Sequence, residues 1–181
     1  MWLIDERLAF HHFLASDKTI KSMPVSESKK TTEPDIFALN IYDNPILVNE
    51  GEKLPLASIT LIEIKKPMRN DAVPNTETDP VTQILGYLED IRDGKVKTQC
   101  GRPIPNSDAI PGFCYVICDM SKSVIRCCNS ANLTITNDKM GFFGYNAPYK
   151  AYIEVMSYDR LINIAEDRNR AFFTKLGFPT K

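Results

Sequence analysis

Charged residues interrupt the end of a largely apolar stretch, Ile59 to Pro67, which reads Ile-Thr-Leu-Ile-Glu-Ile-Lys-Lys-Pro. Alternation with a period of two places Glu63 and Lys65 on one face of a strand, and both faces begin with apolar residues. A strand that is apolar on both faces belongs in the middle of a covered sheet. Burying these charges costs on the order of several kcal/mol per ion unless they are paired or bind a metal. The stretch therefore predicts a chemical site.

A second acid, Asp35, follows Pro34 at the start of another predicted strand, Asp35 to Tyr42. Turn-forming residues between the two strands favour antiparallel neighbours, so Asp35 and Glu63 could lie at matching heights. Two such carboxylates are oxygen ligands of the kind that Mg²⁺ binds together with water and substrate oxygens. Hard cations neutralise phosphate charge and generate hydroxide near neutral pH, and Lys65 could orient or help to deprotonate the attacking water. The predicted chemistry is hydrolysis of a phosphodiester.

A helix is predicted after these strands. Asp79 serves as the N-cap acid, Pro80 occupies the first helical position, and Gly94 is the stop signal. Gln83 and Tyr87 are one turn apart, so they lie together on the flank of the buried stripe.

An earlier helix is predicted from Trp2 to about Ser16. Glu6 falls within its apolar stripe, where a leucine would be expected. A slightly rotated stripe would instead leave Glu6 at the edge of the buried face. The sequence gives equal support to the two orientations.

The rest of the chain continues the alternation of strands and helices. A strand is predicted over Phe113–Met120 and a helix over Ser121–Ala131. A hairpin is predicted over Leu133–Tyr158, with its turn at Asp138–Gly141 or at Gly144–Asn146. Ser157 is expected to cap a last helix over Tyr158–Leu176, whose inward-facing residues are Leu161, Ile164, Ala165, Phe172 and Leu176.

The composition is that of a single globular domain: 181 residues, 43% of them hydrophobic and 25% charged. The net charge of −1 supplies no general cationic field, so binding of a polyanion would depend on a local patch or on bound metal. No apolar run approaches the ~18 residues of a membrane span, and no signal peptide is recognisable, which predicts a cytoplasmic protein without a membrane partner. The five cysteines form no CxxC pair and are expected to be reduced core or helix residues.

The order Pro34-Asp35, then Glu63-Ile64-Lys65, then Gln83-Ile84-Leu85-Gly86-Tyr87 resembles the PD-(D/E)xK nuclease superfamily. It is similar in particular to the branch related to RecB-type exonucleases, which carries a Gln-x-x-x-Tyr helix, and the resemblance covers Trp2 to about Gly94. It implies an α/β, restriction-endonuclease-like fold with a mixed central sheet flanked by helices and an N-terminal helix first. The implied functional residues are metal ligands Glu6, Asp35 and Glu63 for Mg²⁺ or Mn²⁺, the catalytic Lys65, and Gln83 and Tyr87, which would position the substrate backbone or the active-site groups. The implied substrate is nucleic acid, with DNA expected.

A looser resemblance involves three segments, 65–69, 101–104 and 168–173. They look like the carboxy-terminal part of large bacterial proteins that begin with a GHKL-type ATPase domain. This resemblance implies that residues 1–181 form a nuclease-like domain of a longer polypeptide, with an ATPase domain as partner in the same chain.

Two alternatives to an active nuclease remain at this point. The first is a catalytically inactive nuclease-like module that binds nucleic acid or a protein partner. The second is a purely structural role, in which Asp35 opens a strand at a turn and Glu63 pairs with Lys65 on a half-exposed strand.

Overall fold

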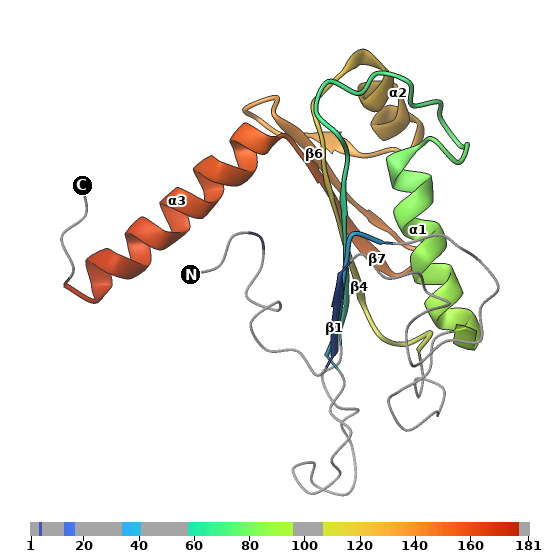
Figure 1. Cartoon of the computed structure of the whole chain (residues 1–181), viewed down its shortest axis with the longest axis horizontal. Coiled ribbons are helices and arrows are strands. Elements are labelled where there is room, and N and C mark those ends of the chain that lie inside the picture. The colour runs from blue at the N-terminus through green and yellow to red at the C-terminus, as the bar shows by residue number, and fades with distance from the viewer. Residues whose placement is uncertain (1–3, 5–12, 17–33, 41–57, 96–106, 178–181) are drawn as a thin grey trace, which may run out of the picture.

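A computed structural model describes residues 4, 13–16, 34–40, 58–95 and 107–177 of the chain. Its described part is built on a seven-stranded sheet with the order β1-β2-β3-β4-β7-β6-β5 (Figure 1). The strands are β1 (Phe13–Ser16), β2 (Ile36–Asn40), β3 (Ser58–Ile64), β4 (Gly112–Ile117), β5 (Thr134–Ile135), β6 (Gly141–Asn146) and β7 (Ala151–Met156). The helices are α1 (Pro80–Asp90), followed directly by the short turn η4 (Ile91–Lys95), α2 (Lys122–Ser130) and α3 (Tyr158–Lys175).

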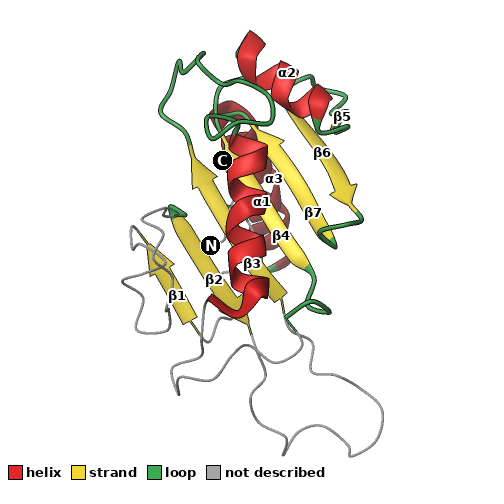
Figure 2. Cartoon of the chain, turned by 90° about the vertical axis from the view of Figure 1, so that its right-hand side faces the viewer, coloured by secondary structure: helices red, strands yellow, loops and turns green. Residues whose placement is uncertain are grey.

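The sheet is mixed. Strands β3, β4 and β7 are parallel, whereas β1 and β2 on one side and β6 and β5 on the other are antiparallel to their neighbours. Helices α1 and α2 cover one face, and α3 starts on the opposite face (Figure 2). The predicted α/β class with a mixed central sheet flanked by helices is confirmed, as is the antiparallel pairing of β2 with β3.

Strand β3 lies in the interior of the described sheet, between β2 and β4, as expected of a strand that is apolar on both faces. All of its residues except Ile64 are buried. Ile59 and Leu61 join the core beneath α1, while Ile62 joins a smaller core on the face where α3 begins. Both faces of β3 therefore have apolar cover, and the end of the strand is held at the boundary between core and solvent.

A local signal sets the start of α1 correctly, whereas the predicted stop, Gly94, lies in η4, after α1 has ended at Asp90. The buried Asp79 carboxylate accepts hydrogen bonds from the backbone N–H of Val81 at 2.9 Å and of Thr82 at 3.3 Å. An N-cap of this kind contributes about 0.5–2 kcal/mol to stability. At the other end, Gly94 adopts a φ of 72°, a left-handed conformation that residues with a side chain rarely adopt.

The predicted N-terminal helix is wrong over its last four residues. Phe13–Ser16 form β1, which pairs with β2 at the edge of the sheet. Hydrogen bonding to a neighbouring strand here overrides the weak local preference for helix. Apart from Ile4, residues 2–12 lie outside the described part of the chain.

The predicted hairpin is a three-stranded meander. Its first turn lies between β5 and β6 and includes Asp138–Met140, close to one of the two predicted turns. The alternative turn, Gly144–Asn146, is wrong, because these residues belong to β6 and the chain reverses at residues 147–150 instead. Gly144 allows the side chain of Leu133 to pack against its backbone, because a Cβ at this position would lie 2.7 Å from a methyl carbon of Leu133.

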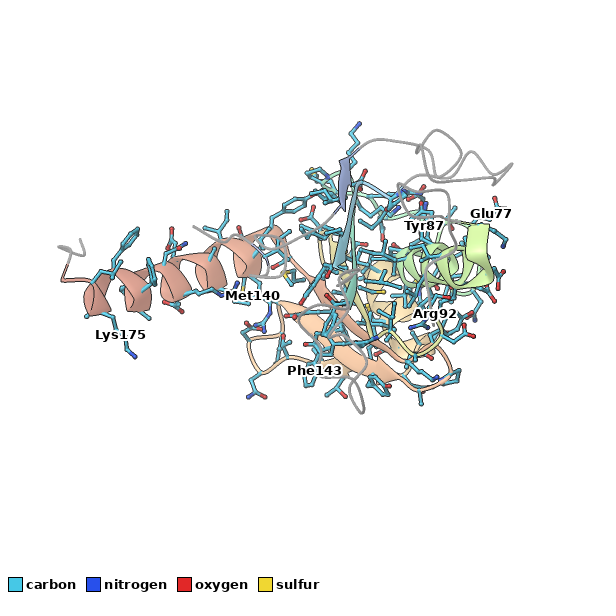
Figure 3. All side chains as sticks on the ribbon, turned by 90° about the horizontal axis from the view of Figure 1, so that it is seen from below. Glu77, Tyr87, Arg92, Met140, Phe143 and Lys175 are labelled. Carbon is cyan, nitrogen blue, oxygen red and sulfur yellow. The ribbon has the colours of Figure 1, made fainter. Side chains whose placement is uncertain are left out.

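The last helix has the predicted limits but a different buried face. Leu161 and Ala165 are buried as expected, whereas Phe172 and Leu176 are 47% and 54% exposed. The reason is the direction of α3, which runs outward from the sheet so that Lys175 lies far from it (Figures 1 and 3). The apolar stripe continues along the helix after the sheet has ended.

Two predictions from composition can be compared with the described residues. The cysteines described by the structure, Cys114, Cys118, Cys127 and Cys128, are buried free thiols, as expected. Cys100 lies outside the described residues. No described helix is both long enough and apolar enough to cross a membrane.

Candidate active site

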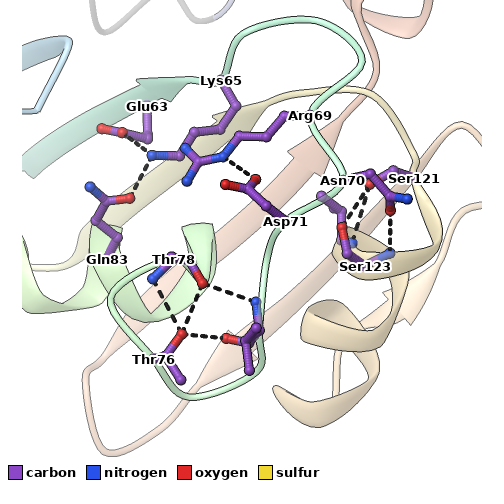
Figure 4. A network of polar contacts seen from close by, with 12 residues as sticks. Glu63, Lys65, Arg69, Asn70, Asp71, Thr76, Thr78, Gln83, Ser121 and Ser123 are labelled. Atoms are coloured by element: carbon purple, nitrogen blue, oxygen red, sulfur yellow. Dashed lines mark hydrogen bonds and ion pairs between the residues drawn. The ribbon is translucent and has the colours of Figure 1, made fainter.

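The acid and the lysine at the end of β3 form a buried ion pair. Glu63 is 5% exposed and Lys65 is 7% exposed. The Lys65 ammonium donates hydrogen bonds to Glu63 Oε1 and, at 2.5 Å, to Gln83 Oε1 on α1 (Figure 4). The two charged side chains thus share the face of the sheet that α1 covers. The salt-bridged pair expected from a structural role is present, but the strand that carries it is buried and not half-exposed.

One oxygen of this pair is left unsatisfied. Glu63 Oε2 is buried and has no hydrogen-bond partner among the described residues. Burial raises the pKa of the Glu63 carboxyl, Lys65 lowers it, and the Asp35 carboxylate raises it further. Most buried polar atoms in proteins have a partner, so an unpaired carboxylate oxygen calls for an explanation. It marks a position at which a cation would be stabilising.

Asp35 lies beside Glu63 across the β2–β3 pairing. Ile36 is paired with Ile62, so the register brings Asp35, the residue just before β2, opposite Glu63. The half-buried Asp35 carboxylate accepts a hydrogen bond from the Ile64 N–H at 2.5 Å. The start of β2 and the end of β3 therefore place two carboxylates next to each other, close enough for Asp35 to act on the pKa of Glu63.

Gln83 and Tyr87 complete a line of polar contacts that begins at Glu63. The Gln83 Nε2 amide donates to the Tyr87 hydroxyl at 3.1 Å, one helical turn further along α1. With its nitrogen held there, the amide presents Oε1 to Lys65. Tyr87 itself is 3% exposed. The Gln-x-x-x-Tyr spacing thus serves to orient Gln83 toward the lysine.

Five of the six residues predicted for the site are brought together, namely Asp35, Glu63, Lys65, Gln83 and Tyr87. The sixth, Glu6, lies outside the described residues. Within the described part of the chain, no group of three or more His, Cys, Asp or Glu side chains could hold a metal ion. Among the described residues, the acidic donors at this position are Asp35 and Glu63. Two carboxylates can fit Mg²⁺, because this ion keeps several water ligands.

Two residues near the site were not predicted. The Tyr158 hydroxyl, at the start of α3, donates to the carbonyl oxygen of Lys65 at 2.5 Å. Burial raises the pKa of Tyr158, and the carboxylate of Asp119 raises it further. Asp119 and Tyr158 follow β4 and β7, whose carboxyl ends meet that of β3 at one edge of the sheet. Their position directly after parallel strands was the signal available in the sequence.

Comparison of the sequence with protein-family models and with curated proteins, and of the fold with solved structures, returns no match.

Proposed function

We propose that this chain hydrolyses phosphodiester bonds of nucleic acid, with DNA as the substrate, and that it requires Mg²⁺ or Mn²⁺. The observation that carries the proposal is the buried Glu63 Oε2, which has no hydrogen-bond partner among the described residues. Lys65 contacts the other oxygen of this carboxylate, and Asp35 raises its pKa. Stability alone gives no reason for this arrangement, because well-packed apolar residues often replace a buried ion pair at no loss. A site that must meet phosphate and water does require such groups.

The proposed roles follow from the contacts. Asp35 and Glu63 would hold the cation, which supplies charge neutralisation and a more acidic bound water. Lys65 is positioned by Glu63 and Gln83, so its ammonium can orient the attacking water and exchange a proton at Nζ. Gln83, held by Tyr87, can keep Lys65 in place when Glu63 turns to the cation.

Positive charge near the site would compensate for the net charge of −1. Lys66 is exposed and directly follows Lys65, and Arg69 lies in the same loop, where it pairs with Asp71 (Figure 4). A local group of cations is what a polyanionic substrate needs, since the chain as a whole provides no attractive field.

A binding module without catalysis is the second candidate. The observation that favours it is the closed ion pair, in which Lys65 already has two acceptors and needs no ligand to be satisfied. Such a module would retain nucleic acid or a protein partner in the absence of metal and would leave phosphodiester bonds intact.

We further propose a setting for this activity. The looser resemblance of segments 65–69, 101–104 and 168–173 supports a nuclease domain that acts within a longer polypeptide carrying a GHKL-type ATPase domain. The buried free thiols fit the reducing conditions of the cytoplasm.

The deciding experiment is a cleavage assay with end-labelled single-stranded and double-stranded DNA, and with the matching RNAs. We expect cleavage in Mg²⁺ or Mn²⁺ and none in EDTA, with DNA preferred over RNA. Retention of the nucleic acid without cleavage in either metal would favour the binding module, and cleavage that persists in EDTA would exclude the proposed mechanism.

A further inference from the structure

Met68 is an unusually exposed apolar residue next to the site. It lies three residues after Lys65, and its side chain is 88% exposed, more than any other large hydrophobic residue in the described part of the chain. Its backbone has a φ of 63°, in the left-handed region that residues with a side chain seldom occupy. Neither feature helps folding, and a strained backbone position beside a site suggests a functional reason.

The loop that carries Met68 is anchored on both sides. The Met68 N–H donates to Asp119 Oδ2 at 2.5 Å, and the Lys65 carbonyl accepts from Tyr158. Further along, Asn70 Oδ1 accepts from the Ser123 N–H at 3.2 Å, as Figure 4 shows. These contacts come from the ends of β4 and β7 and from the start of α2. The exposure of Met68 is therefore set by the fold around the site and does not come from a loose loop.

The immediate neighbours of Met68 indicate what it contacts. Lys66, two residues before it, is exposed, and Arg69, the next residue, has a side chain that is 35% exposed and pairs with Asp71. Exposed ion pairs are weak, so Arg69 can exchange Asp71 for another anion at little cost. An apolar tip between two cations matches nucleic acid, whose bases lie beside charged phosphates.

We propose that Met68 inserts against the nucleobase adjacent to the phosphate that is cleaved, while Lys66 and Arg69 contact the flanking phosphates. This inference rests on the proposed function and assigns to Met68 a part in the recognition of the nucleic-acid substrate. Methionine is one of the apolar side chains that wedge between base steps, and its sulfur also packs favourably on aromatic rings. The loop would thereby hold an unstacked nucleotide beside Glu63 and Lys65.

The test measures binding and base unstacking separately from cleavage. Short single-stranded and double-stranded DNAs that carry 2-aminopurine would be titrated with the full chain in Ca²⁺, with fluorescence anisotropy and 2-aminopurine emission followed together. For wild type we expect binding and brighter emission. Met68→Ala should weaken binding at least about 5-fold, a loss that only a minority of interface residues cause on truncation to alanine, and should lose the emission change.

Three variants control for side effects of the substitution. Met68→Leu keeps an apolar tip and should restore binding and emission, whereas Met68→Gly relaxes the backbone and should fail like Met68→Ala. Val73→Ala, at a 53% exposed apolar position beyond the anchored loop, should behave as wild type. Unchanged binding and emission for Met68→Ala would overturn the inference while the proposed function stands. Failure of wild type to bind any of the DNAs would overturn both.

Discussion

Replacing Lys65 with methionine is expected to lower metal-dependent cleavage by about 10²–10⁴-fold, the range for loss of a general acid–base group. Methionine nearly preserves the length of the side chain but removes the ammonium that Glu63 and Gln83 hold. Without it, the attacking water loses the ammonium that we propose orients it. The measurement is the single-turnover rate on end-labelled DNA at saturating Mg²⁺.

A matched control is Lys122→Met, which removes an exposed lysine at the first position of α2. It should cleave at the wild-type rate. Cleavage by Lys65→Met within a few-fold of wild type would show that the lysine has no part in the chemistry, and the catalytic role proposed for the Glu-x-Lys pair would then be lost.

The second large effect concerns stability. Removing one partner of a buried ion pair is expected to cost about 3–5 kcal/mol, because the other charge remains buried and uncompensated. Lys65→Met should therefore destabilise the fold, whereas the double variant Glu63→Leu, Lys65→Met should recover most of that loss. Urea denaturation of the wild type, the two single variants and the double variant gives the coupling between the two side chains.

The pH dependence of Lys65→Met provides an independent check. Burial already raises the pKa of the Glu63 carboxyl above its ordinary value of 4.5, and Lys65 opposes this effect. With Lys65 removed, the folded state binds the Glu63 proton more tightly than the unfolded state does. Destabilisation of Lys65→Met should thus be smallest below about pH 4.5 and should grow as the pH rises through the pKa of the folded state. The two side chains would not be coupled if the loss of stability in the double variant equalled the sum of the losses in the two single variants and did not change with pH.

Elements with strong local signals were predictable from the sequence. Apolar residues on both faces indicated a covered, interior strand at β3, and Asp79-Pro80 defined the start of α1 because capping depends on residues that are close in the chain. Three of the contacting site residues, Glu63, Gln83 and Tyr87, lie on these two elements, and Lys65 directly follows β3. Once both are placed, Glu63, Lys65 and Gln83 meet without further assumptions.

Features that depend on distant parts of the chain were not predictable. Gly144 resembles a turn residue, but it serves the approach of Leu133, which only the folded meander shows. Phe172 continues the apolar period of α3 beyond the point where the sheet ends. In the same way, Asp119 and Tyr158 follow strands that the sequence predicts, but their approach to the site depends on the order of the parallel strands, which has no local signature.

The central claim is that Asp35 and Glu63 together bind a divalent cation. It is tested most directly by titrating Mn²⁺ into the wild type, Asp35→Asn and Glu63→Gln and following free Mn²⁺ by electron paramagnetic resonance, with nucleic acid absent. We predict saturable binding of Mn²⁺ to wild type and at least a tenfold loss of Mn²⁺ affinity in each variant. Each substitution replaces one of the two carboxylates with an amide and leaves the other to bind the cation alone. Equal Mn²⁺ affinity in wild type and Glu63→Gln would contradict the account.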